Sequence, residues 1–153
     1  MAKITVRPAR RDDVPAIVAL LADDPLGRGR EDASEPLPET YWQAFGDIAA
    51  QPGNAVLVAE RGRTIVGCLQ LTLIPGLSRR GMKRGLIEGV RVSAACRGLG
   101  IGECLVREAI GIARVAGCGL VQLTSDKSRT DAQRFYERLG FAASHLGMKL
   151  ELK

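Results

Sequence analysis

The strongest constraint on the fold is one stretch in the second half of the chain, VRVSAACRGLGIGECLVREAI, from Val90 to Ile110. A strand-like run breaks into a loop that holds Arg97 and the glycines Gly98, Gly100 and Gly102, and the loop then becomes a helix. Glycine allows tight turns and lets the main chain approach a ligand closely. The first amides of a helix lack an internal partner and favour an anion, and arginine adds a permanent cation that binds phosphate oxygens. The stretch therefore predicts a strand, a loop and a helix that bind a pyrophosphate.

Two well-known phosphate-binding loops do not fit this stretch. The dinucleotide pattern G-x-G-x-x-G requires glycine at position 103, which is Glu103, and its strand would open the chain instead of coming late. The Walker pattern requires lysine followed by serine or threonine after its second glycine, and that pair is absent. The glycine loop must therefore belong to a different kind of site.

The flanking segments predict a mixed order of strands and helices. We expect strands over residues 4–7, 55–60, 64–74, 86–92, 120–124, 141–145 and 148–152. We expect helices after the Asp12–Asp13 cap, over 39–50, over 101–116 and from about 130 to 139. The order β-α-α-β-β-β-α-β-α-β-β predicts a single α+β domain over residues 1–153, an α/β sandwich whose mixed central sheet of about six or seven strands is flanked by four helices. The crossover from 86–92 to 120–124 makes those two strands parallel.

The apolar spacing of the helix over 101–116 predicts which of its side chains are buried. Steps of three and four residues place one set of side chains on a single face. This set is Ile101, Cys104, Leu105, Ala109, Ile112 and Ala113.

Charge and composition restrict the partners. The net charge of +5 favours anionic partners, such as nucleic acid, a membrane surface or a phosphorylated small molecule. The chain holds six aromatic residues, most of them in predicted helices, which argues against a surface that stacks bases and so against nucleic acid. No apolar run reaches the ~18 residues that cross a bilayer, which argues against a membrane partner.

Cysteine and histidine usage and the first residues bear on metal and location. The four cysteines contain no Cys-x-x-Cys pair and the chain has one histidine, His145, so we expect no metal site. We expect His145 to be packed or hydrogen-bonded and not catalytic. The start, MAKITVRPARRDD, lacks the apolar run of a secretory signal, and we expect a cytoplasmic protein.

Two motifs resemble those of a known family. The run from Val92 to Gly102, with Arg97-Gly98-x-Gly100-x-Gly102, resembles the acetyl-CoA signature R/Q-x-x-G-x-G/A of the GCN5-related N-acetyltransferase (GNAT) superfamily. The closing run FYERLGF, residues 135–141, is similar to that family's YxxxGF ending. The resemblance covers nearly the whole chain. It implies the acyl-CoA N-acyltransferase (GNAT) fold, with acetyl-CoA as co-substrate and no metal.

The resemblance also implies how acetyl-CoA is held. The main chain of Val90 and Val92 would pair with the pantetheine arm, and the Val90 amide would polarise the acetyl carbonyl. The pyrophosphate would lie against Arg97 and the amides of the glycine loop, namely Gly98, Leu99, Gly100, Ile101 and Gly102. Many relatives carry an asparagine where this chain has Arg129. Arg129 either reaches the cofactor phosphates or is a solvated helix charge.

Two catalytic residues follow from the same resemblance. Tyr136 matches the tyrosine that protonates the departing thiolate, and its alternative is a side chain that only packs. Glu88 is expected on the same strand face as Val90 and Val92 by period-two alternation, which suits a base that accepts the amine proton. The alternative is a glutamate on the rim that pairs with Arg84 or Arg91.

These expectations together predict an enzyme, an acyltransferase. It would move acetyl from acetyl-CoA to a primary amine, in particular a small molecule, by direct attack in a ternary complex. The alternatives are a protein or peptide N-acetyltransferase and a non-catalytic acyl-CoA-binding regulator, and a homodimer is possible. In the loop over 23–38, Asp23, Asp24, Glu31 and Asp32 either bind a cationic amine or are solvated. In the loop over 75–84, Arg79, Arg80, Lys83 and Arg84 either bind an anionic group or are solvated.

Overall fold

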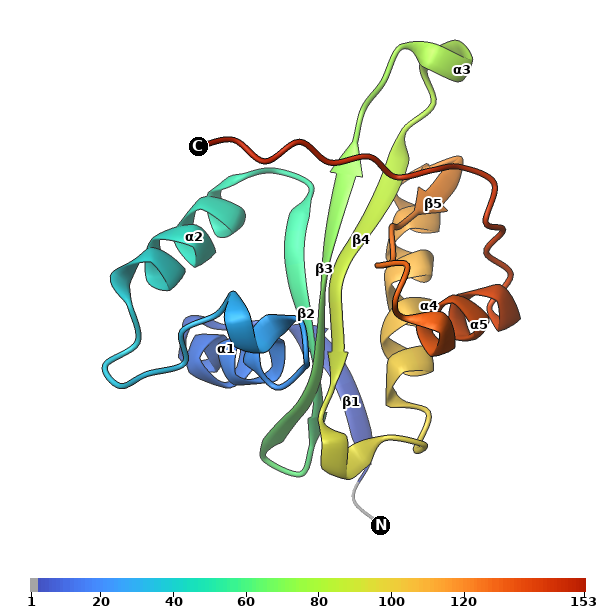
Figure 1. Cartoon of the computed structure of the whole chain (residues 1–153). Coiled ribbons are helices and arrows are strands. Elements are labelled where there is room, and N and C mark those ends of the chain that lie inside the picture. Colours follow the sequence, from blue (N-terminus) through green and yellow to red (C-terminus); the bar gives the residue numbers. More distant parts are fainter. Residues whose placement is uncertain (1–2) are drawn as a thin grey trace.

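The chain folds around one five-stranded sheet in a computed structural model that describes residues 3–153 (Figure 1). The strands are β1 (Ile4–Pro8), β2 (Asn54–Arg61), β3 (Thr64–Ile74), β4 (Arg84–Val92) and β5 (Leu120–Gln122), which lie in this order across the sheet. The pairs β1–β2, β2–β3 and β3–β4 are antiparallel, and β4–β5 is parallel. The parallel pair confirms the predicted crossover.

Helices cover both faces of this sheet. They are α1 (Val14–Ala22), α2 (Glu39–Ala50), the short α3 (Ser78–Gly81), α4 (Ile101–Val115) and α5 (Thr130–Arg138), with 3-10 turns η1 (Arg11–Asp13), η2 (Gly27–Gly29) and η3 (Ala94–Cys96). Figure 1 shows α1 and α2 on one side of the sheet and α4 and α5 on the other. This arrangement confirms the predicted α/β sandwich.

The core lies on both faces of the sheet. On the α4 side, buried side chains of β2, β3 and β4 pack against the inward face of α4. That face consists of Ile101, Leu105, Val106, Ala109 and Ala113. The predictions for Cys104 and Ile112 are wrong, because both side chains are exposed and Val106 takes an inward place instead. A smaller cluster on the α1 side consists of Ile17, Leu20, Val58 and Cys68.

β4 carries an irregularity at Gly89. Across the β3–β4 pair, Cys68 lies opposite Arg91 and Gln70 lies opposite Glu88, so β4 advances three residues while β3 advances two. Gly89 has a φ of +62°, in the left-handed region that glycine adopts at little cost. The extra residue is a β-bulge, which bends the strand and changes which side chains face which layer.

β4 and β5 pair over only a short distance. The paired residues are Arg84 with Leu120, Gly85 with Val121 and Leu86 with Gln122. Beyond Leu86, β4 continues to Val92, whereas β5 ends at Gln122. The main-chain edge of β4 from residue 87 to residue 92 therefore has no strand beside it on the β5 side within residues 3–153. This open edge leads directly to the loop before α4.

The last thirteen residues, 141–153, differ from the prediction. Residues 141–145 and 148–152 were expected to be strands, but neither forms one, so the sheet has five strands and not six or seven. The alternation of apolar and polar residues is present in this segment. A strand also requires a neighbouring main chain, and no strand of residues 3–153 pairs with this segment.

The basic loop before β4 lies far from the glycine loop. Arg79 and Arg80 are exposed on α3, at φ values of +52° and +62°. This loop precedes β4 and the glycine loop follows it, so the two lie at opposite ends of that strand (Figure 1). The basic loop cannot assist the glycine loop in binding the same phosphate group.

Two further findings concern the described part of the chain. None of its helices combines the length and apolar character required to span a membrane. Nor do residues 3–153 contain a group of three or more His, Cys, Asp or Glu side chains that could hold a metal ion.

Candidate active site

The glycine loop has the backbone that its sequence requires. Gly98 and Gly100 have φ values of +80° and +78°, and Gly100 is the N-cap, the residue directly before α4. A Cβ at either glycine would meet no atom within 4 Å, so the space in front of the loop is open. Gly102 serves another purpose, because a Cβ there would lie 3.3 Å from Phe135 and 3.5 Å from Val92. Gly98 and Gly100 shape the turn, and Gly102 allows α4 to approach α5.

The start of α4 presents unpaired amides. Gly100 offers no side chain to cap the helix, and the first main-chain bond into α4 runs from the Cys104 amide to the Gly100 carbonyl, at 3.0 Å. The amides of Ile101, Gly102 and Glu103 therefore point out of the helix without an intrahelical acceptor. Together with the dipole of a helix of 15 residues, they form a site for an anion.

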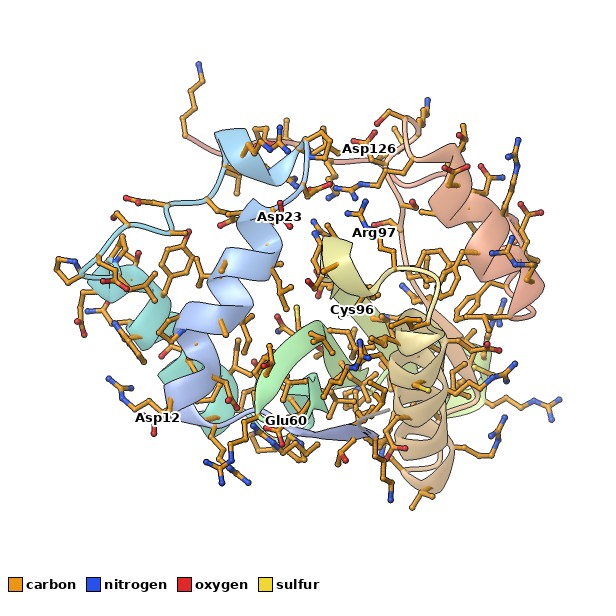
Figure 2. All side chains as sticks on the ribbon, turned by 90° about the horizontal axis from the view of Figure 1, so that it is seen from below. Asp12, Asp23, Glu60, Cys96, Arg97 and Asp126 are labelled. Carbon is orange, nitrogen blue, oxygen red and sulfur yellow. The ribbon has the colours of Figure 1, made fainter. Side chains whose placement is uncertain are left out.

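Arg97 lies on the same loop. Its side chain is exposed, and it has no hydrogen bond or ion pair to any residue in the range 3–153. Figure 2 shows it beside Cys96, on the segment that leads to the start of α4. A free guanidinium beside unpaired amides is suited to phosphate oxygens. The structure therefore brings together the six loop residues, 97–102, that the sequence predicts for this site.

Val90 and Val92 lie on the open edge of β4. Their side chains are half-buried and pack against the cluster on the α4 side. The Val90 carbonyl accepts a hydrogen bond from Nη1 of Arg91 at 2.9 Å, the side chain of the next residue. Main-chain groups at an open edge can pair with an extended ligand as they would with another strand.

The bulge places Glu88 differently from the prediction. Ile87 packs on the α4 side, so its neighbour Glu88 points to the α1 side. Val90 and Val92 face the α4 side, because the extra residue at Gly89 shifts the alternation. The expectation that Glu88 shares a face with the two valines is therefore wrong. Glu88 is exposed on the side of α1.

Tyr136 is half-buried in an aromatic cluster on α5. Its ring lies edge-on to Phe135, with centroids 5.1 Å apart, and to Phe141, at 5.8 Å. Burial raises the pKa of the Tyr136 hydroxyl, and the charges of Arg91 and Arg129 oppose this only in part. Tyr136 therefore keeps its proton at neutral pH, as a general acid must.

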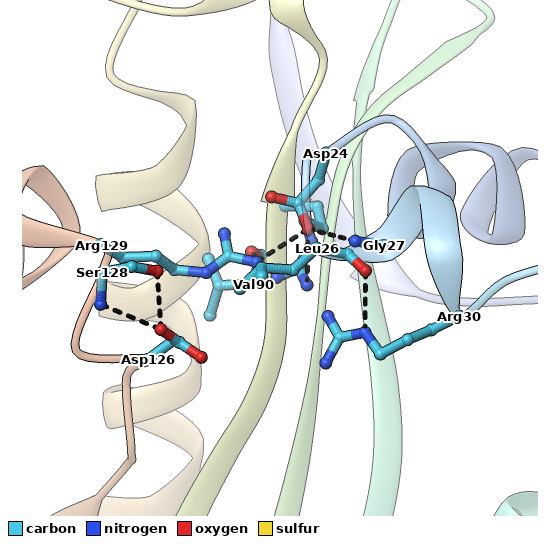
Figure 3. A network of polar contacts seen from close by, with 9 residues as sticks. Asp24, Leu26, Gly27, Arg30, Val90, Asp126, Ser128 and Arg129 are labelled. Carbon is cyan, nitrogen blue, oxygen red and sulfur yellow. Dashed lines mark hydrogen bonds and ion pairs between the residues drawn. The ribbon is translucent and has the colours of Figure 1, made fainter.

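A buried carboxylate lies near the open edge of β4. The sequence did not single out this residue from the other acids of its loop. Asp24 follows α1 and is only 6% exposed. Its Oδ2 accepts hydrogen bonds from the Gly27 amide at 3.0 Å and from Nη2 of Arg129 at 2.8 Å. Nη2 of Arg91 lies 3.6 Å from the same oxygen. Figure 3 shows Asp24 from the α1 side and Arg129 from the α5 side meeting above Val90.

This cluster links three parts of the chain that are distant in sequence. Burial by itself raises the pKa of Asp24, but hydrogen bonds from Arg129 and from the Gly27 amide outweigh it and lower the pKa below its ordinary value. Asp24 is therefore ionised and already paired, which disfavours the idea that it is a free acid for a cationic amine. Arg129 is directed to Asp24, and its contact with cofactor phosphates stays a prediction. No spacing rule in the sequence connects positions 24 and 129.

The other acids of the loop over 23–38 are arranged around Tyr41. The Tyr41 hydroxyl donates to Glu31 and accepts from the Asp32 amide, both at 2.9 Å. These hydrogen bonds connect the loop to α2. The Glu31 carboxylate thus accepts a hydrogen bond from a tyrosine, while the Asp23 side chain is exposed to solvent.

The cysteines are placed unfavourably for a covalent mechanism. Cys68 is buried on β3, and burial raises the pKa of its thiol to about 12. A thiol with this pKa is almost entirely protonated at neutral pH and is a poor nucleophile. The exposed Cys104 lies in the first turn of α4, where its side chain points away from the core.

Comparison with known proteins agrees with this site. A family model described as the acetyltransferase (GNAT) family matches residues 15–141. The chain is 39% identical to a glucosamine 6-phosphate N-acetyltransferase of Trypanosoma brucei brucei over 88 residues. These residues are 58% of this chain and 58% of that protein. It is 34% identical to an aminoalkylphosphonate N-acetyltransferase of Salmonella typhimurium over 70% of this chain and 71% of that protein.

A solved structure is similar over almost the whole chain. It comes from Bacillus halodurans and is described as a transcriptional regulator, with 49% identity and a TM-score of 0.96 over 98% of this chain and 100% of that one. The family match covers both the glycine loop and the aromatic run around Tyr136. The chain therefore belongs to the acetyltransferase (GNAT) family, a family of acyltransferase enzymes.

Proposed function

We propose that this protein is an N-acetyltransferase that moves the acetyl group of acetyl-CoA to the primary amine of a small molecule. The observation that carries the proposal is the open edge of β4, which runs into the uncapped start of α4 and lies beside a protonated Tyr136. One edge, one anion site and one proton donor are the parts that acyl transfer from a long phosphorylated thioester requires. A cytoplasmic location and a homodimer remain predictions that accompany it.

Successive parts of acetyl-CoA fit successive groups of residues in the site. The amides from Gly98 to Gly102 and the Arg97 guanidinium would hold the pyrophosphate, because they are hydrogen-bond donors at an uncapped helix start that faces open space. The main chain of Val90 and Val92 would hold the pantetheine arm. The thioester would then lie between Val90 and Tyr136, whose side chains pack against the same core cluster on the α4 side.

The chemistry follows from these positions. The amine nitrogen attacks the thioester carbonyl carbon while the Val90 amide donates to the carbonyl oxygen, a contact of the kind that typically lowers a barrier by about 3 kcal/mol. The carbon–sulfur bond then breaks, and the sulfur takes the Tyr136 proton. Glu88 accepts the proton of the amine, through water, from its exposed position on the α1 side. Acetyl passes directly to the amine in a ternary complex, without an acetyl-cysteine.

The charges around Val90 favour negative charge at the reaction centre. Arg91 and Arg129 share the single carboxylate of Asp24, so the cluster has an excess of one positive charge. Such an excess stabilises a departing thiolate in a site of low dielectric. The same two arginines lower the pKa of Tyr136 and so make it a better acid than burial alone would allow.

We propose further that the acceptor amine carries an anionic group. Two relatives are named for amines that bear a phosphate or a phosphonate. In this chain Arg30, directly after η2, and Arg129 approach the open edge of β4 from opposite sides (Figure 3). Arg30 uses its Nε for the Leu26 carbonyl at 3.1 Å. Its remaining guanidinium donors are suited to a phosphate or phosphonate.

A second candidate is a non-catalytic acyl-CoA-binding regulator. The Bacillus halodurans protein described as a transcriptional regulator favours it, because that chain is 49% identical to this one. A protein or peptide N-acetyltransferase is the third candidate. A regulator would bind acetyl-CoA without turnover, which separates it from both enzymes.

One assay distinguishes these functions. Release of free CoA thiol is measured with acetyl-CoA and a panel of amines that includes pairs with and without a phosphate or phosphonate, and a set of peptides. We expect turnover with small amines and a lower KM for the phosphorylated member of each pair. Binding of acetyl-CoA without turnover of any acceptor would favour the regulator, and turnover of peptides alone would favour the third candidate.

Two variants test the assigned groups. Tyr136→Phe removes the acid and should lower kcat 10²-fold or more, because general acid catalysis contributes about 10²–10⁴-fold. Glu88→Gln should lower kcat at neutral pH, where a primary amine of pKa about 10 is protonated, and the difference should shrink at alkaline pH. Glu108→Gln, an exposed glutamate of α4, is the matched control and should leave kcat unchanged. Full activity of both test variants would remove these two roles.

A further inference from the structure

Two loops from opposite layers of the molecule meet at the open edge of β4. Nη2 of Arg129, in the loop before α5, lies 2.8 Å from Oδ2 of Asp24, in the loop after α1. The two residues are 105 positions apart in the chain. Within residues 3–153, no other hydrogen bond or ion pair joins these two loops. The Asp24–Arg129 ion pair is therefore a single junction between the α1 layer and the α5 layer.

The ion pair lies beside the main chain of Val90. Nη1 of Arg91 donates to the Val90 carbonyl at 2.9 Å, and Nη2 of the same side chain lies 3.6 Å from Oδ2 of Asp24. One arginine side chain thus covers the distance from the ion pair to β4. Figure 3 shows Asp24 and Arg129 reaching toward each other across β4 from opposite sides. A ligand that follows this edge of β4 must therefore pass the ion pair.

Each partner of the ion pair is also held by a turn of its own loop. Oδ2 of Asp24 accepts a hydrogen bond from the Gly27 amide at 3.0 Å. A Cβ at Gly27 would clash with the Leu21 carbonyl, so this turn requires glycine. On the other side, the Arg129 amide donates to the Asp126 carbonyl at 2.9 Å. Because neither turn depends on the ion pair, its loss should separate the two loops and leave both turns folded.

Burial distinguishes this ion pair from the others of α5. The side chains of Asp24 and Arg129 are 7% and 28% exposed, and their contact is a short, charge-assisted hydrogen bond. The pair between Arg134 and Asp131 is 3.7 Å long, with side chains 73% and 99% exposed. Exposed pairs of this kind contribute little, because water screens them. Arg134 therefore provides a matched control for Arg129.

We propose that the Asp24–Arg129 ion pair is a clasp that closes over the coenzyme arm on the β4 edge and limits how fast CoA enters and leaves. The clasp rests on the proposed function, because that function places the pantetheine arm along Val90 and Val92. The ion pair must open before the arm enters and again before it leaves. The arm is uncharged and competes for neither side chain, so the clasp is equally stable before and after binding. Asp24 and Arg129 are positioning residues, and neither takes part in the chemical step.

Surface plasmon resonance with CoA over the immobilised full chain measures both rate constants. Arg129→Gln and Asp24→Asn each remove the clasp, so each should raise the association and dissociation rate constants by similar factors of about tenfold or more. Kd should then stay within about threefold of wild type. The double variant should match the single variants, because all three lack the same ion pair. Arg134→Gln should leave both rate constants unchanged.

A purely structural role would not raise both rate constants together, and circular dichroism at the assay temperature checks that each variant is folded. Arg129→Gln keeps the test valid if Asp24→Asn unfolds, because the Arg129 side chain is partly solvated. The conservative variant Arg129→Lys retains the charge and should restore rate constants closer to wild type than those of Arg129→Gln.

Three results would overturn the clasp. Wild-type rate constants in Arg129→Gln and Asp24→Asn would do so and leave the proposed function intact. A faster dissociation in Arg129→Gln alone, with Asp24→Asn like wild type, would show that Arg129 binds the cofactor phosphates directly. A folded wild-type chain that does not bind CoA would refute the proposed function and the clasp together.

Discussion

The Asp24 cluster leads to a sharp prediction about stability. Asp24→Asn keeps the size of the side chain and removes its charge, which leaves Arg129 and Arg91 without their shared carboxylate. The side chain of Asp24 is 7% exposed and that of Arg129 is 28% exposed, so solvent compensates only in part. Removing one partner of a fully buried pair costs about 3–5 kcal/mol, and a hydrogen bond to a charged group contributes about 1.5–3 kcal/mol. Because Arg129 is partly solvated, we expect a loss of about 2–3 kcal/mol.

Urea unfolding followed by circular dichroism measures this loss. With a slope of about 2 kcal/mol per M, the midpoint of Asp24→Asn should fall by about 1 M or slightly more at pH 7. Asp23→Asn is the matched control, because Asp23 is the adjacent residue and is exposed. Its midpoint should change by less than about 0.25 M, since surface substitutions usually stay within about 0.5 kcal/mol. Equal midpoints for the two variants would refute the reasoning.

The pH dependence of the same difference provides a second check. The pKa of Asp24 in the folded protein is lowered, so the unfolded chain binds a proton at a higher pH than the folded one. The stability that the carboxylate contributes is fully present above the unfolded value of about 4 and is lost as the pH falls through the folded value. The gap between wild type and Asp24→Asn should be constant from about pH 5 to 8 and should narrow below about pH 4. A gap that widens in acid would contradict the assigned direction.

Two further predictions concern the glycine loop and the buried thiol. Gly100→Ala places a Cβ in open space, but the residue must keep a left-handed conformation. The substitution should lower the free energy of unfolding by about 1 kcal/mol and the melting temperature by about 2–4 °C. The control Gly111→Ala, within α4, should not lower the melting temperature. A melting temperature of Gly100→Ala equal to wild type would argue against the φ assigned to that residue. Iodoacetamide at pH 8 should modify Cys104 in the folded protein and Cys68 only after denaturation, because burial shields Cys68 and raises its pKa to about 12. Peptide mass spectrometry reads both sites, and rapid labelling of Cys68 in the native protein would show that β3 is not buried as described.

The local parts of the candidate site could be predicted from the sequence. The left-handed turns at Gly98 and Gly100, and the helix that begins after them, depend on residues within a few positions of one another. The same holds for the aromatic run around Tyr136, whose spacing fits one face of a short helix. Local main-chain preferences and helical periodicity are sufficient for such features.

The position of Glu88 required the structure. Strict alternation along β4 puts Glu88 on the side of Val90, and the bulge at Gly89 reverses this. A glycine inside a strand pattern is itself a signal of a bulge, so this error had a visible cause in the sequence. Which residues oppose each other across β3 and β4 is decided by the whole sheet, and alternation within one strand does not contain that information.

The sequence by itself determined α1, α2, α4 and α5, the five strands that form the sheet, the glycine loop and the family, because each of these depends on residues close together in the chain or on the spacing within one motif. The tertiary structure alone decided that Asp24 bridges Arg91 and Arg129, because ion pairing depends on distance in space, and these residues come from the loop after α1, from β4 and from the position just before α5. It also decided that the alternating tail is not a strand within this chain. A strand requires hydrogen bonds to a second main chain, and a side-chain pattern states only which face such a strand would bury.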